Sequence, residues 1–389
     1  MSLLRHRTAE ERTSLWCGVV ALPAVVSIGV AVWHGLRRGH DFQWSGAHML
    51  ARHIDPYQQS LQHDPGNLIL MNQVPNYLHE LYVLLLPLGL LPFGIAKDIW
   101  VAINLGFVGA CVWLLGRSYG LKRSQIWLLG LLLGASTPFR VTVSSGQTAL
   151  LETFLLILVA TSFAGGGVAL GASYFKYSFS PVIVCYQAMR GRWSCLAKFA
   201  VAPLLGLAIF WVLVHGNVFR EAMEPFAVSR NHGVALGEGD LMSCDYSFRL
   251  HYGFNPVSTS GALPAALGSV VLGAIVAARR AKDCDSFPAL ICASLMLFTH
   301  LSYDYVALVI PLAALLRSTT GEGLAMHRSQ QILAGISIGL LWYVMPSMNR
   351  IAPAVLPDSV IDASMGHLLL CFGCMLPKAT PALVAKGAR

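Results

Sequence analysis

The chain has 389 residues, of which 55% are hydrophobic and only 12% are charged. A soluble domain carries about 25% charged residues, so this composition excludes an ordinary soluble protein and indicates helices that cross a membrane. The apolar runs are long and do not alternate, which excludes a membrane-spanning β-barrel. The net charge of +8 is therefore interpreted through membrane topology and not as a sign of nucleic-acid binding.

Apolar segments that approach the length of a spanning helix, roughly 20 residues, follow one another along the chain. They are 16–34, 97–116, 124–139, 147–163, 196–215, 262–279, 285–300, 303–317, 330–346 and 365–377. Segment 166–189 is interrupted at Lys176, which predicts two half-length helices with this lysine at the turn between them. Segment 78–92 is short and contains Pro87, and we interpret it as a helix that lies in the membrane interface.

The positive charges predict the orientation, because Lys and Arg favour cytoplasmic loops. If 78–92 does not cross, most of the 27 Lys and Arg residues fall on one side and most acidic residues fall on the other. We therefore predict about 12 transmembrane helices with both termini cytoplasmic, in a bacterial plasma (inner) membrane. The basic N-terminus and the apolar run after it resemble a signal anchor, which we expect to be retained.

This topology places the long loops 35–96, 216–261 and 347–364 on the extracytoplasmic face. Elaborate loops on one face predict that the chemistry occurs there. Asp41 opens the first of these loops, at the membrane border. A carboxylate at such a border can act as a base on a substrate held half in lipid. The simpler alternative is that Asp41 caps a helix.

The first outer loop also holds Tyr57, within Asp55-Pro56-Tyr57, and His79 at the start of the interfacial helix. Tyr57 is either an interfacial aromatic anchor or a substrate contact. His79 is either solvated among the headgroups or functional. In the second long loop, Arg249 lies in the polar segment 245–252, where ligand contact and loop packing are equally reasonable.

Polar residues recur in the shorter outer turns. Gln147, which follows Gly146, offers both a donor and an acceptor to a hydroxylated substrate, and Arg140 is a candidate for binding a phosphate group. Lys176 lies at membrane depth, where a buried lysine needs an anion. That anion is either Glu152 or a substrate phosphate.

The last polar turn contains His300 and Asp304 at two adjacent helix ends. They can face the same cavity, although surface placement without function is the alternative. Together with the other polar residues of the outer turns, they predict a cavity with a carboxylate base above. Lys176, at the half-helix turn, then lies deeper in the membrane than these residues, where it can bind a lipid-linked phosphate. Nothing in the sequence resembles a dedicated metal site, so no metal or other cofactor is expected.

Several short motifs resemble glycosyltransferase family 87 in their order and approximate spacing, from about residue 35 to about residue 316. They are Asp41-Phe42, Asp55-Pro56-Tyr57, residues 87–92 followed by Trp100, Gly146-Gln147, Lys176 followed by Pro181, and Ser302-Tyr303-Asp304-Tyr305. The resemblance implies a GT-C-like bundle that forms a single domain over 1–389, with 317–389 as C-terminal transmembrane helices. The chain departs from the family pattern at 245–247 and at 302–304, which concerns sugar and acceptor specificity.

Members of this family transfer mannose, or a related sugar, from a polyprenyl-phosphate donor to a glycolipid or glycan acceptor. The resemblance implies that Asp41 is the catalytic base and that Lys176 lies near the donor site. The first alternative is a transporter or flippase for a lipid-linked glycan, which would use the same cavity without bond chemistry. The second is a membrane acyltransferase with His79 or His300 as its base.

Overall fold

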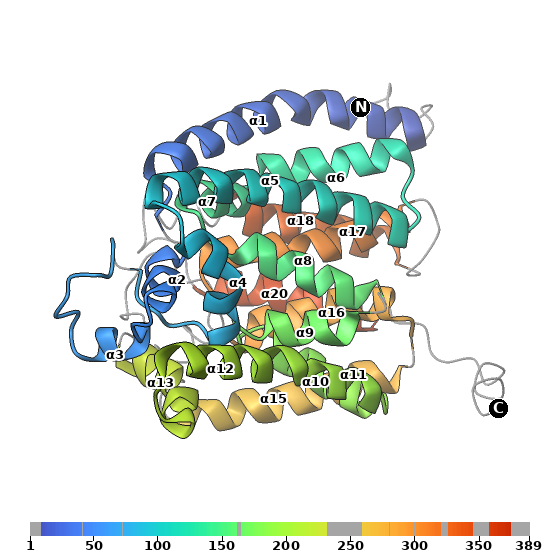
Figure 1. Ribbon diagram of the computed structural model, residues 1–389. Coiled ribbons are helices and arrows are strands. Elements are labelled where there is room, and N and C mark those ends of the chain that lie inside the picture. The colour runs from blue at the N-terminus through green and yellow to red at the C-terminus, as the bar shows by residue number, and fades with distance from the viewer. Residues whose placement is uncertain are drawn as a thin grey trace.

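The computed structural model describes residues 9–40, 42–71, 73–161, 165–231, 259–279, 281–298, 300–319, 326–344 and 358–374. In these residues every regular element is a helix, which confirms the predicted all-α class. Most of the longer helices run side by side, and several short helices gather at one end of the bundle (Figure 1).

Three described helical stretches are long and apolar enough to cross a membrane, namely Thr13–Arg38, Phe93–Ser118 and Trp193–Val214. They belong to α1 (Ala9–Arg38), to α5 (Phe93–Ser118), and to α11 (Trp193–Phe199) with α12 (Val201–Val214). A fourth arises if α6 (Arg123–Ala135) and α7 (Thr137–Ser145) count as one span. By length and apolar character the described helices thus support three or four spans, and the predicted total of about 12 is not confirmed.

Large apolar side chains cover the outer faces of the peripheral helices. Leu22 of α1 is 73% exposed and Leu204 of α12 is 64% exposed, and α15 (Thr259–Ala278) presents Leu267 and Ile275 in the same way. Soluble proteins rarely expose contiguous apolar surface of this kind. Lipid is the solvent that such faces require, which supports an integral membrane protein.

The predicted helix 124–139 is wrong in its extent, because α6 ends at Ala135 and α7 begins at Thr137 with a bend of 61°. Ser136 causes the break. Its backbone is extended, and its hydroxyl accepts a hydrogen bond from the amide of Phe139, as an N-cap does. Pro138 follows in the first turn, where a missing N–H is tolerated. The helical conformation consequently continues beyond residue 139, as far as Ser145.

The centre of the bundle is formed by helices that are mainly apolar and largely buried. They are α8 (Ala149–Ala160), α16 (Asp283–Leu297), α17 (Val309–Ser318) and α20 (Asp358–Cys374), with α18 (Arg328–Gly339) and the π-helical turn η3 (Leu340–Val344) beside them. Leu150, Leu290 and Ile310 are fully buried here. A helix without a polar stripe is stable only when neighbours surround it. The surrounding helices provide these neighbours here.

The predicted half-helices are present as α9 (Gly166–Ser173) and α10 (Ser180–Met189), with Lys176 in the turn between them. The glycines of α9 allow close packing against α11. A Cβ atom at Gly167 would lie 2.6 Å from the carbonyl oxygen of Cys195, and one at Gly171 would overlap the carbonyl oxygen of Phe199. Small residues permit this backbone-to-backbone approach in membrane helices.

The first of the predicted long loops contains α2 (Trp44–Ala51), α3 (Pro56–Leu61) and α4 (His79–Gly89), and the second begins with α13 (Val218–Asn231). Helix α4 lies within the predicted segment 78–92. Helix α2 packs on α4, and α13 packs on α3. A second apolar cluster, which includes Tyr57, Tyr82 and Phe210, holds this end of the bundle together, so these helices form a packed cap.

Candidate functional site

Asp41 lies outside the described residues, but the residues on both sides of it are fixed. The amide of His40 donates to the carbonyl oxygen of Ser145 at 3.0 Å, and the side-chain amide of Gln73 donates to the carbonyl oxygen of His40. Phe42 is fully buried and stacks on Trp100 of α5 with 5.8 Å between ring centroids. The chain on both sides of position 41 is therefore anchored to the end of α7 and to α5.

The end of α7 carries two of the predicted site residues. Gly146 terminates the helix with a φ of 81°, a conformation that favours glycine. Its carbonyl oxygen accepts the indole N–H of Trp100 at 2.8 Å. Gln147 is buried directly after it, whereas Arg140 is half-buried with its guanidinium 3.4 Å from the hydroxyl of Thr137. Trp100 thus supports both Phe42 and the turn that holds Gln147.

Lys176 forms an ion pair with Asp304, which lies in the first turn of the 3₁₀ helix η2 (Ser302–Leu308). Both side chains are largely buried, and the ammonium also lies 4.8 Å from the ring centroid of Tyr303. Of the two anions considered from the sequence, Glu152 is not the partner. The carboxylate of Glu152 is buried, and neither of its oxygens has a hydrogen-bond partner in the described part of the chain.

His300 is buried beside the same aspartate. Its Nδ1 lies 3.2 Å from the second carboxylate oxygen of Asp304, and its Nε2 lies 3.3 Å from the carbonyl oxygen of Ser294. Both partners are acceptors, so a neutral imidazole can satisfy only one of them with its single N–H. The predicted pair of His300 and Asp304 therefore does come together, and Lys176 completes a cluster of three.

Two contacts connect this cluster to its surroundings. Helix α7 packs against η2, where the hydroxyl of Thr142 lies 3.5 Å from the carbonyl oxygen of Tyr303. The amide of Leu78, just before α4, donates to the carbonyl oxygen of Phe175 at 3.1 Å. Direct contacts thus link four segments in series: the chain around position 41 contacts the end of α7, α7 contacts η2, and η2 contacts the half-helix turn.

Tyr57 and His79 are integrated into the aromatic packing of the cap. The Tyr57 hydroxyl donates to the carbonyl oxygen of Tyr77 at 2.8 Å, and its ring meets that of His79 at 5.2 Å. His79 is buried, and its Nε2 lies 3.0 Å from the carbonyl oxygen of Glu221. His79 is therefore buried and not solvated among headgroups. Arg249 lies outside the described residues.

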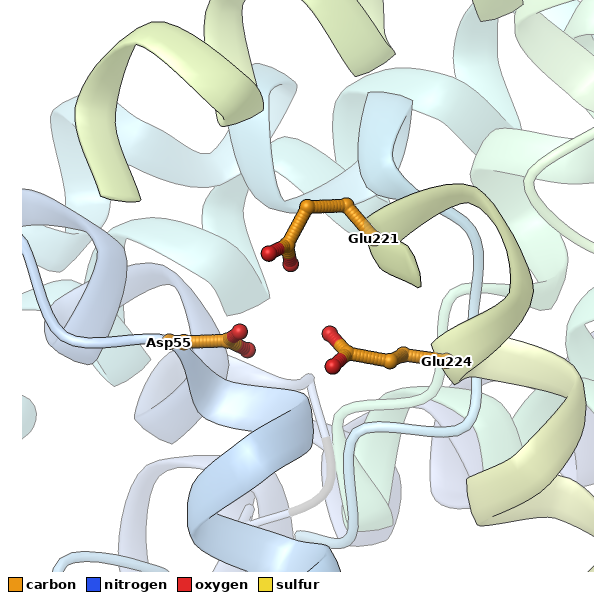
Figure 2. Close-up of side chains that lie close together, drawn as sticks. All are labelled: Asp55, Glu221 and Glu224. Carbon is orange, nitrogen blue, oxygen red and sulfur yellow. The ribbon is translucent and has the colours of Figure 1, made fainter. Parts of the chain in front are cut away.

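A second polar cluster, at the junction of α3 and α13, was not identified from the sequence. Asp55 caps α3 and accepts hydrogen bonds from the amides of Tyr57 and Gln58, and it faces Glu221 and Glu224 of α13 (Figure 2). Burial raises the pKa of Asp55 to about 6. Burial, followed by the hydrogen-bonding contact with Glu221, raises the pKa of Glu224 to about 8. The i, i+3 spacing of the two glutamates can be recognised in the sequence. Their proximity to Asp55 cannot, because it depends on the packing of α13 on α3.

Residues 81–311, more than half of the chain, match the model of glycosyltransferase family 87. No curated protein and no solved structure matches the chain. The match includes α4, the end of α7, the half-helix turn and η2. The chain belongs to glycosyltransferase family 87 and is a membrane glycosyltransferase.

Proposed function

We propose that this enzyme transfers a hexose, mannose by the family resemblance, from a polyprenyl-phosphate donor to a glycolipid or glycan acceptor. The reaction would take place on the extracytoplasmic face of a bacterial plasma membrane and would invert the anomeric centre. Family membership favours a transferase over the transporter and acyltransferase alternatives. The buried cluster of Lys176, Asp304 and His300, which α7 links to the anchored chain around position 41, is the observation that carries the proposal.

Asp41 would act as the general base. Its carboxylate would accept the proton of the acceptor hydroxyl while that oxygen forms a bond to the anomeric carbon. The bond between the anomeric carbon and the phosphate oxygen would break at the same time, and the electron pair would leave with the polyprenyl phosphate. A single displacement of this kind gives the inverted product. The leaving group is a phosphate, so it requires charge stabilisation and not a strong acid.

Lys176 would supply that charge stabilisation. An ammonium group has three N–H donors, and among the described contacts Asp304 accepts one of them. Asp304 and the ring of Tyr303 hold the ammonium in place, so that the other donors would be directed to the donor phosphate. Arg140 is the second candidate for that phosphate. His300 would position or polarise one of the two substrates, and Gln147 would bind a sugar hydroxyl.

A transfer assay with purified protein in detergent tests the proposal. The donor is synthetic polyprenyl-phosphate mannose and the acceptor is a membrane lipid extract. We expect transfer by the wild type and a loss of about 10²–10⁴-fold in Asp41→Asn, the usual contribution of a general base. Asp98→Asn is the matched control, because Asp98 is an exposed carboxylate on α5. Wild-type rates in Asp41→Asn would exclude Asp41 as the base.

A further inference from the structure

Asp55, Glu221 and Glu224 bring three carboxylates together where α3 meets α13. One ligand oxygen of each residue lies within 4.8 Å of those of the other two. The side chains extend toward a common point from two different elements (Figure 2). The cluster lies outside the cluster of Lys176, Asp304 and His300, and the proposed transfer reaction does not use it.

Each of these carboxylates has one oxygen that is buried and lacks a hydrogen-bond partner among the described residues: Asp55 Oδ2, Glu221 Oε2 and Glu224 Oε2. The glutamates are 0% and 3% exposed, respectively. Buried carboxylate oxygens are normally hydrogen-bonded or bound to a cation, because desolvation without compensation is costly. Three such oxygens within one cluster of carboxylates therefore point to a missing positive ligand.

The described residues compensate this charge only in part. Arg220 contacts Glu221 Oε1 and Glu224 Oε1, each at 3.1 Å, and Gln58 donates to Glu224. These contacts use the first oxygen of each glutamate and leave the second free. With all three carboxylates ionised and one guanidinium beside them, the cluster has a net charge of −2. One divalent cation would neutralise it.

We propose that Asp55, Glu221 and Glu224 form a binding site for a hard divalent cation, Ca²⁺ in the first place. All three ligands are carboxylates, which prefer hard cations such as Ca²⁺, Mg²⁺ and Mn²⁺. Softer metals prefer thiolate ligands. Ca²⁺ accepts flexible coordination at 2.3–2.6 Å, which fits ligands supplied by two separate helices. Mg²⁺ requires a near-ideal octahedron.

The bound cation would connect the two long outer loops. Asp55 belongs to the loop 35–96, which also contains position 41, and the glutamates belong to α13, which follows α12. The carbonyl oxygen of Glu221 also lies 3.0 Å from His79 Nε2 at the start of α4. A cation at this junction would thus hold α3, α4 and α13 as one unit and stabilise the cap of the bundle.

Two measurements on the purified full chain in detergent, stripped with EDTA, test this site. The first is the melting temperature with CaCl₂, MnCl₂ or MgCl₂ against NaCl at matched ionic strength. A cation that binds only the folded state raises the melting temperature in a saturable way. The second is Tb³⁺ luminescence excited through tryptophan, since Tb³⁺ replaces Ca²⁺ at oxygen ligands. Trp211 is the expected energy donor, because its indole donates to the carbonyl oxygen of Gly216, and a Cβ atom added at Gly216 would overlap Oε1 of Glu221.

The double variant Glu221→Gln/Glu224→Gln is expected to lose the calcium-dependent rise and to bind Tb³⁺ about tenfold or more weakly, because ligand charge sets the affinity. Asp55→Asn is the second variant. It keeps the helix cap, since Asn caps as well as Asp, and removes only the charge, so it tests the site even if the double variant does not fold. Asp98→Asn, an exposed carboxylate, should behave as the wild type.

The proposal is overturned if none of the three cations changes the melting temperature of the wild type. It is also overturned if Asp55→Asn and the double variant respond as strongly as the wild type. A stability that depends on pH but not on any of these cations would show that protons, and not a metal, neutralise the cluster. The proposed sugar transfer is not at stake in any of these outcomes, because neither readout measures activity.

Discussion

Lys176 and Asp304 form a buried ion pair between residues 128 positions apart in the sequence, and this pair joins the half-helix turn to the start of η2. The side chains are 12% and 2% exposed. Removing water from two charges is costly, and their attraction repays that cost only when both partners are present. The position of the lysine ammonium therefore depends on Asp304, and that of the carboxylate depends on Lys176 and His300.

Loss of either partner should destabilise the protein. Lys176→Met and Asp304→Asn are each expected to lower the free energy of unfolding by about 3–5 kcal/mol, because each leaves an uncompensated buried charge. The double variant should recover most of this loss, since both charges are then absent. Denaturant or thermal unfolding of the four proteins in detergent provides the coupling energy.

The double variant also separates the structural role of Lys176 from its proposed role in the reaction. We expect it to remain deficient in sugar transfer although its stability returns, because the charge for the donor phosphate is gone. If the two single losses simply add in the double variant, the ion pair is not coupled. If transfer returns together with stability, the lysine only supports the fold.

Trp100 supports the site from α5 through two contacts. Its indole N–H donates to the carbonyl oxygen of Gly146, and its ring stacks on Phe42. Trp100→Phe keeps an aromatic ring but deletes the hydrogen bond, which is worth about 0.5–1.5 kcal/mol. We expect a comparable loss in unfolding free energy and a larger fall in kcat/KM, since the turn before Gln147 and the chain next to Asp41 both lose support.

Trp113→Phe is the matched control for this variant. Trp113 lies on the same helix but is 58% exposed, so its replacement should change neither stability nor transfer. A Trp100→Phe enzyme that has the wild-type kcat/KM would show that the Gly146 turn is held in place without this hydrogen bond.

The parts of the site that the sequence reveals are local. Lys176 interrupts an otherwise apolar run, and a charge in such a run is a strong signal. His300 and Asp304 are four residues apart, so one turn brings them together. The break at Ser136 was equally local. Its sequence, Ser136-Thr137-Pro138, is a cap followed by a proline in the first turn, but the continuous apolar pattern on both sides predicted an uninterrupted helix.

The parts that the sequence does not reveal depend on tertiary contacts. The sequence suggested Glu152 or a substrate phosphate as the anion for Lys176. Only the packing of η2 against α7 and α8 brings Asp304 to the lysine. In the sequence, Glu221 and Glu224 resemble ordinary charged residues on the polar face of a helix. They become a cluster only because α13 packs on α3, whose Gln58 reaches Glu224 across 166 residues of sequence. No local pattern encodes such pairings.

The contact between α9 and α11 determines where the half-helix turn lies, and Gly171 is its closest point. A methyl group there would overlap the carbonyl oxygen of Phe199, and backbone cannot move aside as a flexible side chain can. We expect Gly171→Ala to lower the melting temperature and to reduce transfer, because α9 would shift and displace Lys176. Gly109→Ala is the control, because a Cβ atom at Gly109, on α5, meets nothing within 4 Å. Alanine is favoured over glycine inside a helix by roughly 0.5–1 kcal/mol, so this control should be neutral or stabilising. Equal melting temperatures for the two variants would mean that α9 does not need close contact with α11.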